Sequence, residues 1–226
     1  MLYYCQSEMY SKLDNRLLGQ ITEAATILKR GGIVAYPTDT VYGLGASAAD
    51  PGAVARIFEV KNRPPTMAFP LLLSHISQIS EYAVQIPPLA WFLAAKFLPG
   101  AITIVLYKSS AVSNIVTGGS EKVGLRVPAH PVPIALIEAI GAPLVGTSAN
   151  VSGRTSALTA GEVLQQIGDR IDFIIDGGRV SGGIESTVVD VTGENPVVLR
   201  EGAISINEIE SSILTFDPKL KFIKSN

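Results

Sequence analysis

Apolar residues along the chain follow two spacings, one typical of helices and one typical of buried strands. Leu17, Ile21 and Leu28 recur at helical spacing, and Gly31-Gly32 follows as a stop signal. Capping residues such as Asp50-Pro51 and Thr159 mark the starts of further helices. These signals predict helices over residues 17–28, 51–63, 88–98, 131–140 and 159–167, and a last helix that starts after Ser205.

Short apolar runs bounded by Gly, Pro or polar residues predict buried strands between the helices. In the helix that opens at Pro87-Pro88, we expect Phe92, Leu93 and Phe97 to face inward. No repeat, linker or low-complexity tract interrupts the alternation of elements. The pattern predicts one α/β domain on a twisted mixed sheet flanked by helices. Its strands are expected at residues 33–36, 70–74, 101–107, 123–127, 144–146, 173–175, 187–191 and 197–200.

The predicted strand 33–36 runs into a polar segment flanked by glycines. Pro37 cannot donate to a sheet ladder, so the strand ends or reaches an edge there. Residues 38–40 (Thr-Asp-Thr) then place hydroxyls and a carboxylate where a core strand carries aliphatic groups. Gly43 and Gly45 allow another group to approach the backbone closely. Binding sites of α/β proteins are built in this way, and a strand followed by a threonine-rich turn is the alternative.

The composition narrows the class of protein. With 47% hydrophobic and 17% charged residues, the 226-residue chain can bury a core, which excludes the disordered and coiled-coil classes. Eighteen basic and twenty acidic residues leave no overall electrostatic footprint for nucleic acid, although a local basic pocket is compatible with them. The single cysteine, Cys5, favours a reducing compartment. The sequence shows neither a signal peptide nor a membrane span, so we expect a cytoplasmic protein without membrane contact.

Two pairs of polar side chains stand two positions apart after predicted elements. Lys61 and Arg63 end a helix before Pro64, which disfavours helical geometry in the residue before it. In an extended segment these two cations point the same way and can meet one phosphate or carboxylate; a solvated, positive helix C-terminus is the alternative. Ser148 and Asn150 repeat the spacing after a short predicted strand, with a local Asx or Ser turn as the alternative.

Two further arginines are expected to need partners. Arg126 lies inside a strand-like run and Arg200 ends another strand, so each requires an internal salt bridge or a ligand carboxylate. The chain has no Walker A, Rossmann, zincin or nucleophile-elbow motif, and neither His75 nor His130 lies in a recognised nucleophile context. Cations and hydroxyls without an obvious covalent nucleophile suit anionic substrates and phosphoryl or nucleotidyl transfer.

Seven motifs, in order along nearly the whole chain, resemble those of the YrdC/Sua5 family, the threonylcarbamoyl-AMP synthases. One such motif is weak evidence, whereas seven in sequence are specific. The motifs are Tyr36-Pro-Thr-Asp-Thr-Val-Tyr-Gly-Leu-Gly45, Lys61-x-Arg63-Pro, Pro99-Gly-x-x-Thr103, Arg126-Val-Pro-x-His130, Ser148-Ala-Asn150-x-Ser-Gly, Glu185-Ser-Thr-Val and Leu199-Arg-Glu-Gly202.

The resemblance implies a YrdC-like fold with a concave, positively charged cavity, and a nucleotidyltransferase activity. Family members join L-threonine, bicarbonate or CO2 and ATP, with Mg²⁺, into L-threonylcarbamoyladenylate and pyrophosphate. Other proteins then transfer the threonylcarbamoyl group to adenosine 37 of tRNA, and direct binding of tRNA or double-stranded RNA is a further expectation. The alternatives are a non-catalytic RNA-binding or regulatory module of the same fold, and a carbamoyl-transfer domain of a longer, zinc-binding enzyme.

The resemblance also implies roles for individual residues. Lys61 and Arg63 are the expected catalytic residues, whereas the metal ligands stay unassigned. Departures from the family pattern are Met67 and Leu72, which stand where many members have an Asn that touches ATP and a His that touches threonine. Threonine is expected to bind Thr40, Arg126, Gly146 and Ser186, and ATP to bind Arg63, Lys122, Ser148, Asn150, Ser156 and Arg200.

The resemblance divides the chain into three parts. Residues 1–16 form an N-terminal extension, residues 17–204 the YrdC-like catalytic domain, and residues 205–226 a C-terminal helix and tail. The extra C-terminal domain of longer members is not expected. We therefore consider the tail, residues 216–226, as a candidate for closing over the nucleotide.

Overall fold

The computed structural model describes residues 13–224, so Cys5 and most of the expected N-terminal extension lie outside the described residues. No helix within residues 13–224 is long and apolar enough to cross a bilayer. The helices of this region are α2 Asn15–Lys29, α3 Pro51–Lys61, α4 Ile79–Tyr82, α5 Pro88–Phe97, α6 Asn114–Thr117, α7 Pro131–Ile140, α8 Ala160–Ile167 and α9 Ile206–Phe216, with 3₁₀ helices η1 Ile76–Gln78 and η2 Gly168–Arg170.

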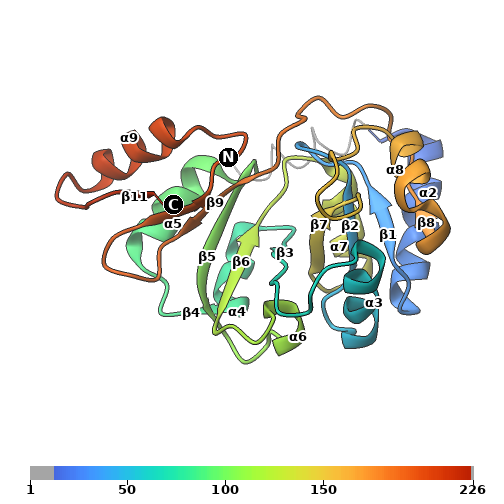
Figure 1. The fold of residues 1–226 in the computed structure, drawn as a ribbon, viewed down its shortest axis with the longest axis horizontal. Coiled ribbons are helices and arrows are strands. Elements are labelled where there is room, and N and C mark those ends of the chain that lie inside the picture. Colours follow the sequence, from blue (N-terminus) through green and yellow to red (C-terminus); the bar gives the residue numbers. More distant parts are fainter. Residues whose placement is uncertain (1–12, 225–226) are drawn as a thin grey trace.

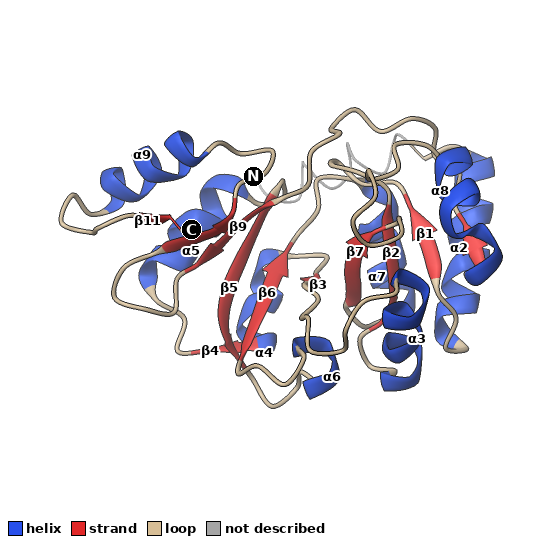
Figure 2. Cartoon of the chain, in the orientation of Figure 1, coloured by secondary structure: helices blue, strands red, loops and turns tan. Residues whose placement is uncertain are grey.

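The strands form one mixed sheet in the order β11-β10-β9-β5-β6-β3-β7-β2-β1-β8, with β4 paired to β5 (Figure 2). Parallel pairs such as β5/β9 and antiparallel pairs such as β5/β6 occur side by side. This arrangement confirms the predicted fold class. The strands are β1 Val34–Tyr36, β2 Gly43–Ser47, β3 Leu71–Leu72, β4 Ala83–Val84, β5 Ile102–Lys108, β6 Lys122–Arg126, β7 Leu144–Ser148, β8 Phe173–Ile174, β9 Thr187–Asp190, β10 Val197–Arg200 and β11 Ile223–Lys224.

Capping residues fix the helix starts that the sequence predicts. The Asp50 side chain accepts hydrogen bonds from the backbone of Gly52 and Ala53, and Pro51 takes the first helical position of α3. Thr159 caps α8 and Ser205 caps α9 in the same way. Helix α2 begins after its cap at Asp14, slightly before the predicted start.

Alternate residues of the strands face two different apolar clusters. Val34, Tyr36 and Leu144 pack with α2 and α7 on one face. Ala35 and Val145, their neighbours in sequence, belong to a larger cluster that includes residues of α3, α5 and α8. Figure 1 shows α2 and α8 at one end of the sheet and α5 and α9 at the other.

The structure corrects three local predictions. Gly43 and Gly45, interpreted as the flank of a polar loop, lie in β2, which pairs with both β1 and β7. The predicted strand 70–74 keeps sheet geometry only at β3, whereas β7 extends beyond its prediction to Ser148. Phe92 and Phe97 pack against the main apolar cluster and are half-buried, in agreement with their prediction, and the ring of Phe92 also contacts Phe216 of α9 with 5.2 Å between ring centroids.

Candidate functional site

A cavity of about 800 Å³ opens over the sheet, lined by residues of β1, β2, β3, β5, β6, β7, β9 and β10 and by the segment after α3. Four glycines form part of its lining, and at three of them a side chain of a neighbouring strand fills the room that the glycine leaves. A Cβ atom at Gly146 would lie 2.7 Å from Leu72 Cγ, and one at Gly43 would lie 2.8 Å from the Tyr36 ring. At Gly124 it would meet the Thr103 methyl group at 2.9 Å. Larger residues at these positions would displace those neighbours or fill part of the cavity.

Basic side chains outnumber acidic ones in the lining by six to two, which suits an anionic ligand. Each of these groups comes from a segment that sequence analysis selected or from its direct neighbourhood. The basic residues are Lys61, Arg63, Lys122, Arg126, Arg154 and Arg200, and the acidic residues are Glu185 and Asp190.

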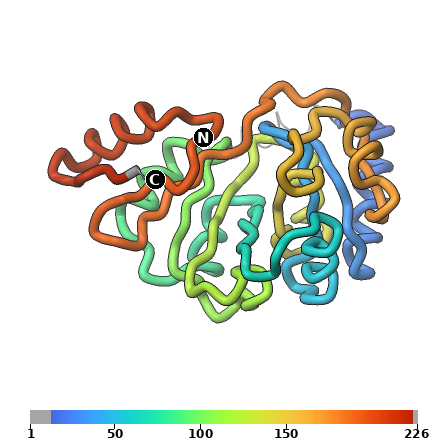
Figure 3. Tube along the Cα trace, viewed as in Figure 1, coloured from blue at the N-terminus to red at the C-terminus, as the bar shows by residue number. Residues whose placement is uncertain are grey.

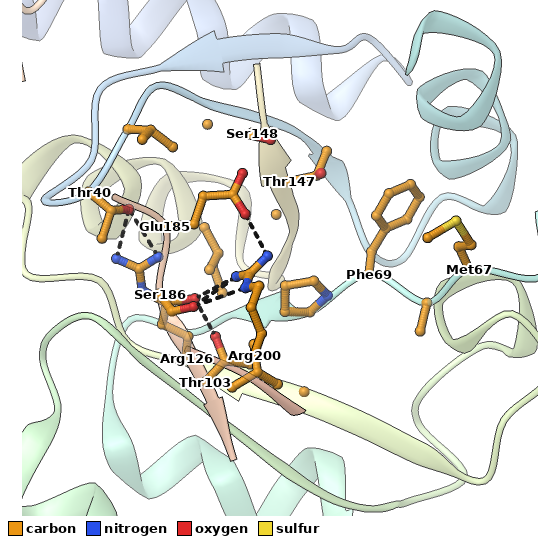
Figure 4. A pocket seen from close by; sticks show the side chains of 18 of the residues that line it. Thr40, Met67, Phe69, Thr103, Arg126, Thr147, Ser148, Glu185, Ser186 and Arg200 are labelled. Carbon is orange, nitrogen blue, oxygen red and sulfur yellow. Dashed lines mark hydrogen bonds and ion pairs between the residues drawn. The ribbon is translucent and has the colours of Figure 1, made fainter. Parts of the chain in front are cut away.

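Arg126 is held by three groups at one end of the cavity. Its Nη2 lies 2.7 Å from Asp39 Oδ1, both Nη atoms lie 3.2 Å from Thr40 Oγ1, and its Nε donates to the carbonyl of Gly100. Figure 4 shows the Thr40 hydroxyl facing the guanidinium. From the sequence, the partner of Arg126 was either an internal salt bridge or a ligand carboxylate. The structure shows a salt bridge with Asp39, and the Arg126 side chain also lines the cavity.

Ser186 links Arg200 to β5. Its hydroxyl lies 2.9 Å from Thr103 Oγ1, and its carbonyl accepts a hydrogen bond of 2.8 Å from Arg200 Nη2. Arg200 also forms an ion pair with Glu185, whose other carboxylate oxygen accepts a hydrogen bond from Ser156. Figure 4 shows Ser186, Arg126 and Arg200 on one side of the cavity, with Met67 and Phe69 on the other.

Lys61 is buried and binds the end of β7. Its Nζ donates to the carbonyls of Ser148 and Asn150, at 2.6 and 3.0 Å, and to Asn150 Oδ1 at 2.9 Å. Burial, together with the nearby charge of Arg63, lowers the pKa of Lys61 to about 8. The predicted extended geometry is wrong: Lys61 ends α3 and Asn62 is a left-handed cap with φ of 51°. Instead of both pointing at a ligand, Lys61 and Asn150 are hydrogen-bonded to each other.

Arg63 lies against Phe69, with its guanidinium carbon 4.9 Å from the ring centroid, and donates to the carbonyl of Ala68. Its Nε is buried and has no hydrogen-bond partner among the residues that the structure describes. Burial and the neighbouring charge of Arg200 lower the pKa of Arg63, despite the opposing effect of Glu185. Arg63 and Arg200 both line the cavity, and an anion bound there would relieve the repulsion between their charges.

The cavity gathers ten of the eleven predicted site residues. The exception is Ser156, which is absent from the lining and donates a hydrogen bond to Glu185, a residue of the lining. Lys122 lines the cavity but is paired with Asp190 at 2.8 Å. The ten are Thr40, Lys61, Arg63, Lys122, Arg126, Gly146, Ser148, Asn150, Ser186 and Arg200.

Three acidic residues that pair with predicted cations, Asp39, Glu185 and Asp190, were missed as site residues. Asp39 and Glu185 were named only as members of motifs, although a carboxylate beside the predicted arginines is the partner that a buried guanidinium needs. Met67 and Leu72 both line the cavity. His75 does not replace the family histidine, because its ring caps η1.

The C-terminal segment does not cover the cavity within the described residues. Helix α9 packs against α5, as the tube in Figure 3 shows, and β11 pairs with β10 at the sheet edge. No residue from 201 to 224 lines the cavity. The expectation that the tail closes over a nucleotide is therefore not met by residues 216–224 in this structure.

Comparisons with known proteins agree with the sequence motifs. The family model Sua5/yciO/yrdC, described as telomere recombination, matches residues 26–202. A threonylcarbamoyl-AMP synthase of Pyrococcus abyssi is 43% identical over 194 residues, covering 86% of this chain and 57% of the relative. A Bacillus subtilis protein of the same name is 42% identical over 195 residues, covering 86% of this chain and 56% of its own. The chain thus spans a little over half the length of these curated relatives.

Solved structures give the same assignment. P. abyssi Sua5 complexed with L-threonine matches with a TM-score of 0.84 and 42% identity, over 89% of this chain and 58% of that one. Escherichia coli YciO matches with a TM-score of 0.73 and 32% identity, over 80% of this chain and 88% of that one. From the family model, the relatives and the fold together, the chain belongs to the Sua5/YciO/YrdC family.

Proposed function

We propose that this chain carries the activity of a threonylcarbamoyl-AMP synthase, a nucleotidyltransferase that joins L-threonine, bicarbonate or CO2 and ATP. The observation that carries the proposal is that Arg63, Arg200, Lys61 and Ser148 line one cavity, in which basic side chains outnumber acidic ones by six to two. Such a cluster suits a polyphosphate. The names of the two relatives with 42% and 43% identity support the same reaction.

Threonine would bind at the Arg126 end of the cavity. Its carboxylate would approach Arg126 and Thr40, whose donors converge there, with Gly146 and Ser186 nearby in the lining. A Sua5 of known structure that is 42% identical to this chain is complexed with L-threonine, which supports this choice of substrate. ATP would lie toward Arg63, Ser148, Asn150 and Arg200, with Ser156 acting through Glu185.

The reaction requires no enzyme nucleophile. The threonine amine attacks CO2, or bicarbonate with loss of hydroxide, and loses a proton to give a carbamate. A carbamate oxygen then attacks the α-phosphate, and the bond to the β-phosphate oxygen breaks to release pyrophosphate. The part of the protein is to hold both substrates and to stabilise charge on the phosphates, which Arg63 and Arg200 are suited to do.

Mg²⁺ is the expected companion of ATP, and the cavity fits a metal held mainly by phosphates. Within residues 13–224 there is no group of three or more His, Cys, Asp or Glu arranged to bind a metal ion. The two carboxylates of the lining, Glu185 and Asp190, are paired with Arg200 and Lys122, so phosphate oxygens and water would supply most of the ligands of Mg²⁺, as in other nucleotide sites. When bound, Mg²⁺ would neutralise charge on the phosphates.

The direct test is to incubate the protein with ATP, Mg²⁺, L-threonine and isotopically labelled bicarbonate and to search for the labelled adenylate by mass spectrometry. We expect a labelled threonylcarbamoyl adenylate with wild-type protein and none when L-threonine is omitted. Absence of the adenylate from the folded protein would reject the synthase. RNA binding would then be measured, because a non-catalytic RNA-binding module is the alternative. If the adenylate forms, its consumer would be the machinery that transfers the threonylcarbamoyl group to tRNA.

A further inference from the structure

Glu185 places a carboxylate inside the basic part of the cavity. The residue directly precedes Ser186 and β9, and its side chain is 35% exposed. One carboxylate oxygen accepts a hydrogen bond of 3.1 Å from Ser156, and the other forms the ion pair with Arg200. An acidic group therefore contacts two of the residues that the family resemblance assigns to ATP.

The surroundings keep this carboxylate ionised. Burial raises the pKa of Glu185, but the charges of Arg200 and Lys61 and hydrogen bonds from Ser148 and Ser156 outweigh burial and hold the pKa below its ordinary value. Every group that lowers this pKa is also a donor or cation suited to a phosphate. Like a phosphate of a ligand, the Glu185 carboxylate offers these donors and cations negatively charged acceptor oxygens.

We propose that Glu185 is an internal competitor for the phosphate site: its carboxylate occupies part of the place of a phosphate group until a ligand displaces it. This inference rests on the proposed function, since it takes the cavity to bind the phosphates of ATP. A phosphate can gain the full donor capacity of Arg200 and Ser156 only after Glu185 releases them. A bare pyrophosphate would then be held less tightly than the basic lining alone would hold it, which favours its release as a product.

The competing interpretation is that Glu185 only orients Arg200. The two interpretations predict opposite signs for the same substitution. If Glu185 competes, its replacement by an uncharged isostere frees the donors and tightens phosphate binding. If Glu185 only orients, the replacement loosens Arg200 and weakens binding. Affinity for a simple phosphate ligand therefore separates the two.

The test is isothermal titration calorimetry of inorganic pyrophosphate into wild-type protein and Glu185→Gln. Because a hydrogen bond to a charged group contributes about tenfold to a hundredfold in affinity, we expect Glu185→Gln to bind pyrophosphate tighter by about that factor. The matched control is Glu59→Gln, which removes one negative charge from the exposed face of α3 outside the cavity. We expect its affinity to stay within about twofold of wild type.

A second variant, Glu185→Asp, keeps the proposal testable if Glu185→Gln does not fold. Glu185→Asp keeps the charge but shortens the side chain, so contact with both Arg200 and Ser156 is weakened, and its affinity should lie between wild type and Glu185→Gln. Unchanged or weaker pyrophosphate binding in folded Glu185→Gln, or in Glu185→Asp if the first variant does not fold, overturns the proposal. No pyrophosphate binding by any variant overturns it as well.

The experiments distinguish failure of the competitor role from failure of the synthase assignment. A protein that binds pyrophosphate and responds to Glu185→Gln as expected, but forms no adenylate, retains the competitor role and loses the synthase assignment. A protein that forms the adenylate without tighter binding in Glu185→Gln retains the synthase assignment and loses the competitor role.

Discussion

Single residues of the cavity carry charge that is already compensated inside the protein. Arg126 is paired with Asp39, Arg200 with Glu185 and Lys122 with Asp190. Internal partners lower the cost of placing a charged side chain in a partly buried site, and they also fix its orientation before a ligand arrives. For Arg126 the pairing supports ligand binding, because Asp39 holds the guanidinium from outside the cavity lining, whereas Glu185 lies in the lining and is proposed to compete with a phosphate for Arg200.

Asp39 gives a direct test of this view. The substitution Asp39→Asn should raise the KM for L-threonine by about tenfold to a hundredfold with a smaller effect on kcat, because Arg126 loses a charged hydrogen bond that orients it. The control is Asp176→Asn, which breaks an ion pair with Arg16 on the surface and should leave the KM unchanged. Steady-state kinetics at varied threonine would contradict the account if both variants behaved alike.

Lys61 should give the protein a pH-dependent stability above neutrality. Its pKa falls from 10.5 to about 8 on folding, so between these values the unfolded chain binds more protons than the folded chain. The contribution of Lys61 to the free energy of unfolding should therefore rise as the pH increases through this window. Urea unfolding of wild type and Lys61→Met across the window measures it; a difference between the two proteins that does not change with pH would refute the shift.

The site was predictable from sequence to the extent that its residues lie in recognisable motifs. Arg126 and Arg200 were found because a strand-end or buried guanidinium needs a partner, and Arg63 because it stands two positions after Lys61 at the end of a helix. The partner itself was left open for Arg126, since residues 87 positions apart in the chain, Asp39 and Arg126, meet only through the fold. Lys61 was expected to point at a ligand, but its contacts with β7 depend on the packing of α3 against β2, next to β7 in the sheet, which spacing alone does not reveal.

At the scale of elements, close backbone contacts set where the site residues stand. Strand β10 brings Arg200 to the cavity, and the segment after it turns back against the start of β9. Thr187 Oγ1 accepts hydrogen bonds from the backbone of Gly202 and Ile204. A Cβ atom at Gly202 would lie 2.2 Å from the Glu185 carbonyl oxygen, which is backbone and cannot rotate away. Only glycine fits between the two segments that carry Arg200 and Glu185.

Gly202→Ala should consequently destabilise the protein by about 1–3 kcal/mol or more, because the added methyl group separates β9 and β10. The matched control is Gly19→Ala in the exposed part of α2, where, within residues 13–224, no atom apart from the adjacent residues and the backbone of the helix itself lies within 4 Å of the new Cβ. This control should stabilise by about 0.5–1 kcal/mol, as alanine does in a helix interior. Chemical denaturation measures both; equal effects of the same sign would contradict the packing argument.

Elements were predictable where local signals are strong. Caps at Asp50, Thr159 and Ser205 located the starts of α3, α8 and α9. Strand β2 was missed because its sequence, Gly-Leu-Gly-Ala-Ser, has little β propensity and owes its geometry to pairing on both sides. Glycines at positions 43 and 45 are required there by the ring of Tyr36, a contact between strands.

At the scale of the whole molecule, the sheet order collects motifs that are far apart in sequence. Strands β9, β5, β6, β3, β7 and β2 are consecutive in the sheet, and they bring Ser186, Arg126, Ser148 and Thr40 to one cavity. In the proposed function, the threonine carboxylate binds near Arg126 and the phosphates of ATP bind near Arg63, and both arginines line the same cavity. Two anionic substrates held side by side are what a carbamate attack on ATP requires.

The most direct measurement of the central claim is pyrophosphate release from ATP by wild type and Arg63→Ala, with Mg²⁺ and with or without L-threonine and bicarbonate. The account predicts release that requires both co-substrates and that falls by about tenfold to a few hundredfold in Arg63→Ala, since one charged contact to the phosphates is lost. Release that is independent of threonine, or equal in the two proteins, or absent from folded wild-type protein, would contradict it.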